Sequence, residues 1–133
     1  MAPNTSESAK VTGPKDPPPV IMNLAIALER MDGDADLLRE IIDIFLEDHL
    51  GGLKELHAAA EARDSVRLQR AAHTLKGAAG NFVAARATDL ALQLEQICKG
   101  GDLDGGLALV APLDQEITRL ADALRLVRER EVA

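Results

Sequence analysis

From residue 20 onward, apolar residues recur at spacings of three and four, and short polar or glycine-containing segments interrupt the pattern. This spacing is typical of amphipathic α-helices. It predicts five helices, over about residues 20–31, 35–62, 65–82, 85–99 and 102–130. Amphipathic helices joined by short loops pack as antiparallel neighbours. The pattern therefore predicts an all-α protein, an antiparallel four-helix bundle with an additional short N-terminal helix.

The breaks between the segments carry residues that suit helix ends. Aspartate and serine accept hydrogen bonds from the free amides of a first turn, and the candidates are Asp34, then Asp64 or Ser65, then Asp102 or Asp104. Gly100-Gly101 is a helix C-terminal signal. Pro112 removes a hydrogen bond to the carbonyl four residues before it, so we expect it to kink or break the last helix. Gly51-Gly52 is a possible bend in the second helix.

Residues 1–19 differ from the rest in composition, because five of the six prolines lie there. Such a segment buries too little apolar surface to offset its ordering entropy. We expect residues 1–19 to form a disordered Pro-rich tail and residues 20–131 to form the folded domain. The polar N-terminus has no apolar segment that resembles a signal peptide, and no apolar run is long enough to cross a membrane. The expected location is the cytoplasm, with no membrane partner.

The amino-acid composition excludes several further classes of fold and function. Apolar residues make up 47% of the 133, which suffices for one core, whereas aromatic residues make up only 2%. The net charge of −7 and the near absence of aromatic side chains disfavour a nucleic-acid partner. The single cysteine excludes an internal disulfide and a cysteine-rich zinc site, and we expect no bound metal.

The segment over residues 65–82 carries the strongest candidate chemistry. At 100° per residue, one buried stripe is expected, formed by Leu68, Ala71, Ala72, Leu75, Ala79 and Phe82. His73 lies about 160° from Leu75 on the same projection and therefore faces outward. Gly77 and Gly80 lie on the side of His73, and Lys76 lies on the flank.

Two glycines within a helix each cost about 1 kcal/mol relative to alanine, and nothing in a solvent-facing surface requires them. A partner that closely approaches His73 does require them. A neutral imidazole is a nucleophile, and the ammonium of Lys76 offsets the charge of a phosphoryl group. The pattern is consistent with phosphoryl transfer at His73, and an inert surface histidine fits the same pattern equally well.

A sequence resemblance supports the first interpretation. The segment from Ala72 to Phe82, AHTLKGAAGNF, closely resembles the motif of histidine-containing phosphotransfer (HPt) domains. Segments before and after it also resemble the family, namely residues 28–34, 37–39, 45–48, 94–95 and 101–103, so that the likeness covers roughly residues 20–128. The resemblance implies a four-helix bundle, a phosphorylated His73, Lys76 as its electrostatic partner and Gly77 as the residue that permits docking.

The resemblance also implies the kind of partner. An HPt protein accepts a phosphoryl group from a receiver-domain aspartate and passes it to a second receiver, in a response regulator or a hybrid histidine kinase. The chain would thus be a monomeric phosphocarrier and not an enzyme, with no cofactor of its own and with Mg²⁺ held by the receiver. We expect Arg67, Arg70, Lys76 and Arg86 to cluster around the motif and to meet the acidic receiver pocket, with Gly77 and Gly80 clearing the approach.

Several alternatives stay open at the level of sequence. Family members often carry a glutamine near the histidine, and here Gln93, Glu95 and Gln96 all lie in that region. The excess of apolar residues in the first two helices fits burial between neighbours or an exposed docking surface. We expect His49 at the edge of the core, no metal pair between His49 and His57, and a half-buried structural Cys98. An inert helical scaffold and a fragment of a histidine kinase are the rival functions.

Overall fold

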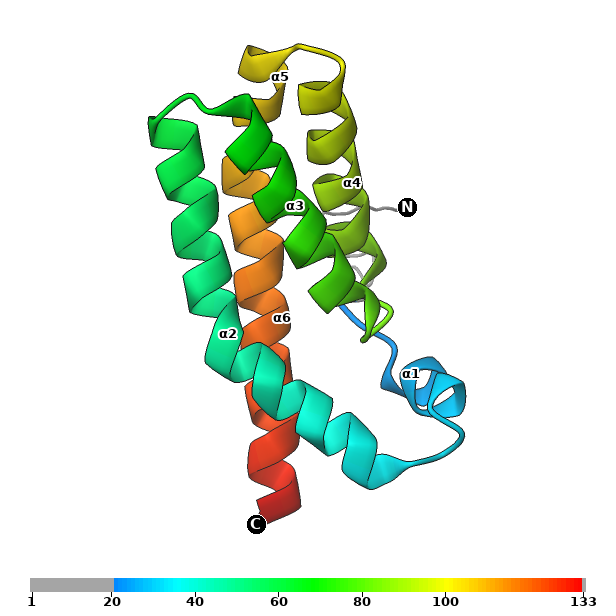
Figure 1. The fold of residues 1–133 in the computed structure, drawn as a ribbon. Helices are drawn as coiled ribbons and strands as arrows, with labels where there is room; N and C mark the ends of the chain where they lie inside the picture. Colours follow the sequence, from blue (N-terminus) through cyan, green and yellow to red (C-terminus); the bar gives the residue numbers. More distant parts are fainter. Residues whose placement is uncertain (1–20, 133) are drawn as a thin grey trace, which may run out of the picture.

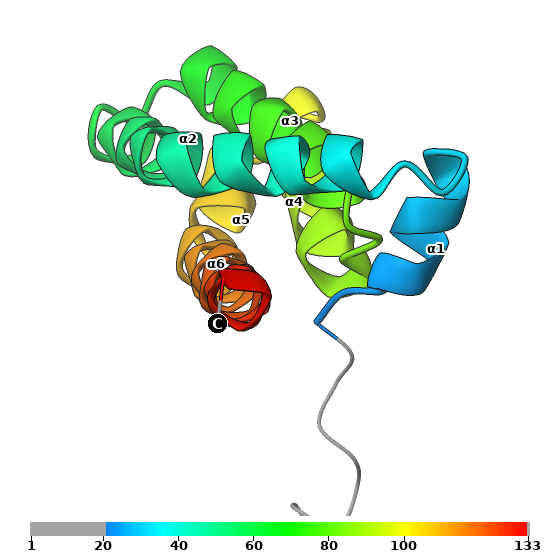
Figure 2. The same ribbon diagram turned by 90° about the horizontal axis from the view of Figure 1, so that it is seen from below.

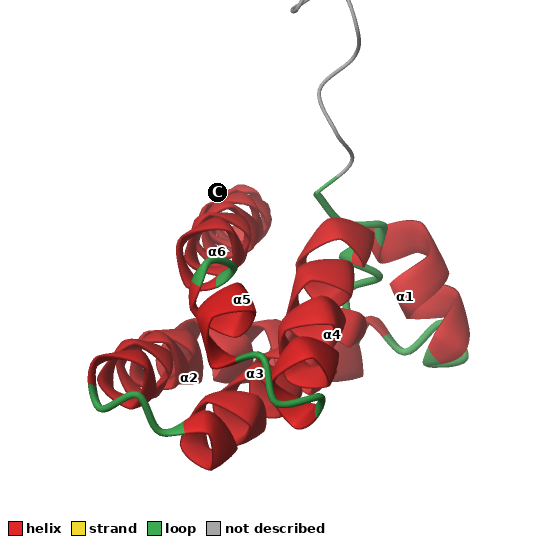
Figure 3. Ribbon diagram, turned by 90° about the horizontal axis from the view of Figure 1, so that it is seen from above, coloured by secondary structure: helices red, strands yellow, loops and turns green. Residues whose placement is uncertain are grey.

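The computed structural model describes residues 21–132, and the regular structure in this range is helical (Figures 1 and 3). The helices are α1 (Leu24–Arg30), α2 (Ala35–Glu61), α3 (Ser65–Gly80), α4 (Ala85–Lys99), α5 (Leu103–Leu107) and α6 (Val110–Val132). The four long helices α2, α3, α4 and α6 alternate in direction (Figure 1). This confirms the antiparallel four-helix bundle with a short N-terminal helix. The predicted tail over residues 1–19 lies outside the described residues.

Side-chain caps begin four of the helices. Asn23, Asp34, Asp64 and Asp102 each accept a hydrogen bond from the amide three residues later, at 2.9–3.1 Å. Asp64 and Asp102 therefore take the capping role, and Ser65 and Asp104 do not. The hydroxyl of Ser65 instead donates to the carbonyl of Cys98 at 3.4 Å.

The turns after α1, α2, α3 and α4 share one geometry. Each contains a residue in the left-handed region, with φ between 52° and 91°, namely Asp32, Arg63, Val83 or Gly101. The amide of the residue that follows it donates to the carbonyl five residues before that amide. This is the closing geometry that favours glycine. Of these four residues only Gly101 is a glycine, and in the turn after α1 the next residue, Gly33, also has a positive φ, of 77°.

Three helix boundaries differ from the sequence-based expectation. The first helix begins at Leu24 instead of residue 20, because the Asn23 amide donates to the carbonyl of Phe82 and the chain is extended there. The third helix ends at Gly80, although Phe82 remains fully buried. The predicted last helix is divided into α5 and α6. The break lies just before Pro112, which confirms the expected effect of this proline.

The core lies between the four long helices. The stripe predicted for residues 65–82 is buried. On α6, four residues at helical spacing are also buried and a fifth, Val127, is half-buried; the buried ones are Leu113, Ile117, Leu120 and Leu124. Small residues bring α3 and α4 close together, because the buried positions include Ala71, Ala72 and Ala79 on α3 and Ala87 and Ala91 on α4. The close packing of these two helices fixes the spacing of side chains along their shared edge.

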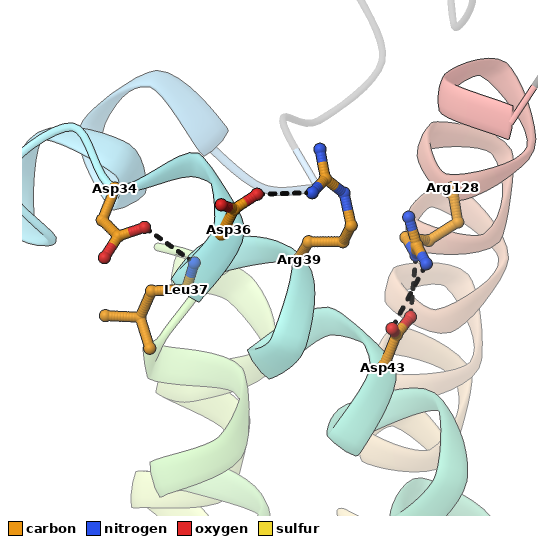
Figure 4. A network of polar contacts seen from close by, with 6 residues as sticks. All are labelled: Asp34, Asp36, Leu37, Arg39, Asp43 and Arg128. Carbon is orange, nitrogen blue, oxygen red and sulfur yellow. Dashed lines mark hydrogen bonds and ion pairs between the residues drawn. The ribbon is translucent and has the colours of Figure 1, made fainter.

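The N-terminal half of α2 and the C-terminal half of α6 extend beyond α3 and α4 (Figures 1 and 2). Arg128 of α6 binds Asp43 of α2 through two hydrogen bonds, of 2.7 and 3.2 Å (Figure 4). On the same half of α2, Asp34 caps the helix and Asp36 pairs with Arg39 at 2.7 Å. The α2 ribbon changes direction near its middle (Figure 1).

Candidate functional site

His73 projects from the solvent side of α3. Its side chain is 66% exposed, whereas Ala72 and Leu75 beside it are buried. This is the orientation that the helical projection predicts, because positions 72 and 75 face the core and position 73 does not. The imidazole is therefore accessible to a macromolecular partner, while its backbone is fixed by the α3–α4 packing.

Glu95 of α4 connects His73 to Lys76. One carboxylate oxygen of Glu95 lies 3.0 Å from Nδ1 of His73, and the other accepts a hydrogen bond of 2.7 Å from Nζ of Lys76. The Glu95 side chain is 17% exposed and that of Lys76 is 26% exposed. One half-buried carboxylate thus binds both α3 residues that the sequence motif singles out.

This contact determines the state of the imidazole. The hydrogen bond from Lys76 lowers the pKa of Glu95 most, and the hydrogen bond from His73 lowers it further, against the opposing effect of burial. An ionised carboxylate only accepts hydrogen bonds, so Nδ1 of His73 carries the proton and donates it to Glu95. In the neutral ring, Nε2 then holds a lone pair, which is the form required of a nucleophile.

Gly77 and Gly80 lie on the side of α3 that carries His73, about one and two turns further along the helix. Neither has a positive φ, and a Cβ added at either would meet no atom within 4 Å. Neither backbone strain nor helix packing therefore requires glycine here.

The basic residues expected around the motif are only partly brought together. Arg70 and His73 line one shallow hollow of about 290 Å³, with Gln69, Thr74 and Glu95. Arg67 is instead bound to Glu55 of α2, at 2.8 and 3.0 Å. Arg86 points to α6, where its Nε lies 3.4 Å from Glu116.

The placement of Arg86 corrects the expected cluster. Residues 86 and 95 are nine positions apart on α4, which places them on opposite sides of a helix with 3.6 residues per turn. Glu95 faces His73, so Arg86 faces away from it. The basic residues that the structure places at the site are Arg70 and Lys76.

Glu95 was one of three candidates that the sequence left open. The periodicity of α4 contains the signal that separates them, because the buried residues are Ala87, Ala91, Leu94 and Cys98. Glu95 lies about 40° from Ala91 on the helical projection, whereas Gln93 and Gln96 lie much further round. The side chain next to the core stripe is the one that reaches α3.

The other histidines and the cysteine have structural contacts. Nε2 of His57 lies 2.6 Å from Asp114 of α6. His49 is 5% exposed, so it is more buried than a residue at the edge of the core, which was the expectation.

Cys98 is 4% exposed instead of half-buried, and burial raises the pKa of its thiol. A Cβ added to Gly106 of α5 would lie 2.5 Å from its Sγ, which explains the glycine at that close approach.

A second hollow lies between α2 and α3. Its volume is about 250 Å³, and its walls are mostly apolar, formed by Ile41, Ile44, Phe45, Asp48, His49, Gly52, Thr74, Leu75, Ala78 and Asn81. Thr74 is the direct neighbour of His73 and also lines the hollow that contains His73. The α2–α3 cavity therefore adjoins the candidate site.

Two further features were tested on residues 21–132. In that range, no three histidine, cysteine, aspartate or glutamate side chains gather in a way that would hold a metal ion. None of the helices in the described part of the chain combines the length and the apolar character needed to cross a bilayer.

The chain is similar to known proteins in sequence family and in fold. Residues 40–123 match the family model of the Hpt domain. Histidine-containing phosphotransfer protein B (HptB) from Pseudomonas aeruginosa PAO1 superposes with a TM-score of 0.76 at 24% identity, covering 86% of this chain and 98% of that chain. The HPT domain of an Hpt sensor hybrid histidine kinase from Shewanella has a TM-score of 0.76 at 17% identity, covering 83% and 95%. No curated protein sequence shows a significant match.

Proposed function

The chain belongs to the Hpt domain family, whose members carry out histidine phosphotransfer in phosphorelays, and we propose that His73 is its phosphoacceptor. In this proposal, His73 accepts a phosphoryl group from a receiver-domain aspartyl phosphate and passes it to the aspartate of another receiver. The observation that carries the proposal is the state of His73. Its Nδ1 is held by Glu95, its side chain is exposed, and no group among residues 21–132 bonds to its Nε2.

The transfer step follows from this arrangement. The lone pair of Nε2 attacks phosphorus, the bond between phosphorus and the aspartyl oxygen breaks, and that oxygen leaves with its electron pair as a carboxylate. The proton on Nδ1 stays in place, so the ring gains positive charge as the new bond forms. The Glu95 carboxylate, 3.0 Å away, stabilises that charge. The reverse sequence of bond changes delivers the phosphoryl group to the second aspartate.

Lys76 acts on two groups in this proposal. Its ammonium donates to Glu95 at 2.7 Å, which keeps the carboxylate ionised and in position. An ammonium has three donors, so further hydrogen bonds to phosphoryl oxygens remain available. Lys76 therefore supports the orientation of the imidazole as well as neutralising the charge of the phosphoryl group.

The partner supplies the rest of the chemistry. Phosphoryl transfer depends mainly on positioning and charge neutralisation, and in this proposal the receiver contributes its aspartate and a Mg²⁺ ion. The chain is then a monomeric cytoplasmic phosphocarrier without kinase activity of its own. Arg70, beside His73, meets the acidic receiver pocket, and Gly77 and Gly80 admit it.

The test is incorporation of label from receiver domains of the source organism, phosphorylated beforehand with a radioactive phosphoryl donor. The wild-type chain should gain one phosphoryl group, stable in base and labile in acid. His73→Gln should gain none and keep its melting temperature, because position 73 is exposed. His57→Gln is the matched control, since it removes an exposed histidine on α2 and should leave labelling unchanged. Label that persists in His73→Gln, or no label with any receiver, would contradict the proposal, and the second result favours an inert scaffold.

A further inference from the structure

His49 is a buried polar group that the transfer step does not use. It lies on α2, is only 5% exposed, and lines the α2–α3 cavity. Its ring stacks on that of Phe45, with centroids 5.4 Å apart and planes 10° apart. The orientation of the imidazole is therefore fixed by packing.

The contacts of His49 determine which nitrogen carries the proton. Nδ1 lies 3.2 Å from the carbonyl oxygens of Phe45 and Leu46, and both of these only accept hydrogen bonds. Nδ1 must therefore be the donor. In the neutral ring, Nε2 is an acceptor, and it has no hydrogen-bond partner among residues 21–132. A buried acceptor without a partner is unfavourable, so a donor that enters the cavity gains more than an apolar group of the same shape.

The cavity adjoins the hollow that contains His73. Thr74 belongs both to its wall and to the hollow around His73. Along α2, the cavity continues into an apolar stripe formed by Ile44, which is 55% exposed, and Leu37, which is 40% exposed. Because Thr74 joins the two hollows, a receiver docked at His73 would lie next to the cavity and to this stripe.

We propose that the α2–α3 cavity receives a side chain of the docked receiver, and that His49 selects one that combines an apolar stem with a neutral hydrogen-bond donor. The inference rests on the proposed function, because that function supplies the partner. A hydroxyl or amide donor fits the unpartnered Nε2. The remaining polar wall residues, Asp48, Thr74 and Asn81, lie at exposed positions, and no basic side chain lines the cavity.

The first experiment measures this preference without the partner. Phenol and toluene have nearly the same shape and differ in one donor, so each is titrated into the full chain and followed by NMR. Phenol should bind at least about fivefold more tightly, which is the ratio expected for one hydrogen bond to an otherwise unpaired acceptor. It should shift the amide signals of Ile44 and Ala78 and the Nε2 signal of His49. Equal affinities, or shifts elsewhere on the surface, would overturn the proposal.

A matched pair of variants separates the acceptor from the packing. The amide of His49→Asn replaces Nδ1 and leaves nothing at the place of Nε2, whereas the amide oxygen of His49→Gln reaches the place of Nε2. The preference for phenol should disappear in His49→Asn and persist in His49→Gln. The comparison between the two ligands in the wild type stands even if a variant folds poorly. Loss of the preference in both folded variants, or in neither, would contradict the role of Nε2.

The same pair is then tested against the receiver that labels His73. His49→Asn should weaken receiver binding at least about fivefold relative to His49→Gln, with acid-labile labelling of His73 still detectable at saturating receiver. Equal receiver affinities would remove the proposal and leave the phosphoacceptor role of His73 intact. Deletion of residues 1–20 should not shift the amide signals of the cavity. If it does, the chain's own N-terminal segment occupies the cavity, and the receiver does not.

Discussion

The carboxylate of Glu95 lies 3.0 Å from Nδ1 of His73, although the two residues are 22 positions apart and belong to different helices. Its other oxygen binds Lys76, one turn along α3 from His73. A single side chain of α4 thus determines both the protonated nitrogen of the imidazole and the position of the nearest ammonium. Substitutions at these residues should separate the two effects.

The titration of Glu95 should show which of its two contacts, with Lys76 or with His73, lowers its pKa more. Followed by the NMR signal of its carboxyl carbon, its midpoint should lie below 4.5, because hydrogen bonds from Lys76 and His73 lower the pKa. Lys76→Met should raise that midpoint more than His73→Gln does, since the Lys76 contact has the larger effect. Lys54→Met, which removes a lysine on α2, is the control and should leave the midpoint unchanged.

The sign of the accompanying stability change follows by linkage. A carboxyl group whose pKa is lower in the folded state than in the unfolded state stabilises the fold above its unfolded pKa. For Glu95 that contribution is complete above about pH 4.5 and is lost as the pH falls through the lowered folded pKa. The difference in unfolding free energy between wild type and Glu95→Gln should therefore shrink below about pH 4.5. A difference that grows on acidification would contradict the assignment.

Glu95→Gln should also slow phosphoryl transfer to His73. The glutamine oxygen can still accept the Nδ1 proton, but it has no charge to stabilise the ring as Nε2 bonds to phosphorus. Charge-assisted hydrogen bonds are about twice as strong as neutral ones, which gives a loss of about fivefold to tenfold in rate. Asp89→Asn, an exposed change of the same kind on α4, is the control for net charge. An unchanged rate in Glu95→Gln would mean that the carboxylate does not act in the transfer step.

The buried side of α3 could be predicted from the sequence because its apolar residues define a single stripe. Leu68, Leu75 and Phe82 repeat every seven positions, and the residues between them are alanines, glycines or polar residues, so the buried side is unambiguous. The exposure of His73 followed directly. A resemblance that extends over most of the chain then identified the candidate chemistry at that position.

The helix α4 could not be predicted to the same depth because it has two apolar stripes. Leu90, Leu94 and Ile97 form the bulkier one, whereas the buried stripe runs through Ala87, Ala91, Leu94 and Cys98. Close packing of α3 and α4 favours small side chains, which hydrophobicity alone does not rank first. The choice between these stripes decides whether Glu95 faces α3, and it also decides the burial of Cys98.

The position of Arg86 required tertiary information as well. Its separation in sequence from the motif is short, but the turn after α3 reverses the chain and places residue 86 on the α6 side of α4. Glu116 of α6 is 7% exposed and binds both Arg86 and Arg119, at 3.4 and 3.3 Å. A buried carboxylate needs such partners, and a sequence pattern does not reveal which arginines they are.

Arg70 and Arg86 should therefore respond differently to the same substitution. Arg70→Ala should slow transfer from the receiver and leave the melting temperature unchanged, because Arg70 is exposed and lies in the hollow with His73. Arg86→Ala should leave transfer unchanged and lower stability by about 1 kcal/mol, because the buried Glu116 loses one of its two partners. Melting curves and transfer time courses for the two variants provide the comparison. If transfer were slower in Arg86→Ala alone, the receiver would approach the α6 side of α4, opposite to His73, and the assignment would be contradicted.

Substitutions at Gly77 should affect the stability of the fold and the docking of the receiver differently. It lies on the exposed side of α3, one turn after His73, and a Cβ there would meet no atom within 4 Å. Gly77→Ala should therefore stabilise the fold by roughly 0.5–1 kcal/mol through helix propensity and backbone entropy. Gly77→Gln should also fold, yet it should slow transfer by up to about a hundredfold, since a displacement of about 1 Å in such an approach can cost that much. The measurements are thermal melting and a transfer time course for both variants.

The control for Gly77→Gln is the same side chain placed elsewhere on an exposed helical surface. Ala111 lines the groove between α2 and α6, away from the hollow that contains His73. Ala111→Gln should leave the rate of transfer unchanged, so that a slower rate in Gly77→Gln reports the approach of the receiver and not the added bulk. A strong loss of stability in Gly77→Gln would show that the glycine packs against another helix. Unchanged transfer in that variant would show that no partner closely approaches this side of α3, and the two glycines beside His73 would then need another explanation.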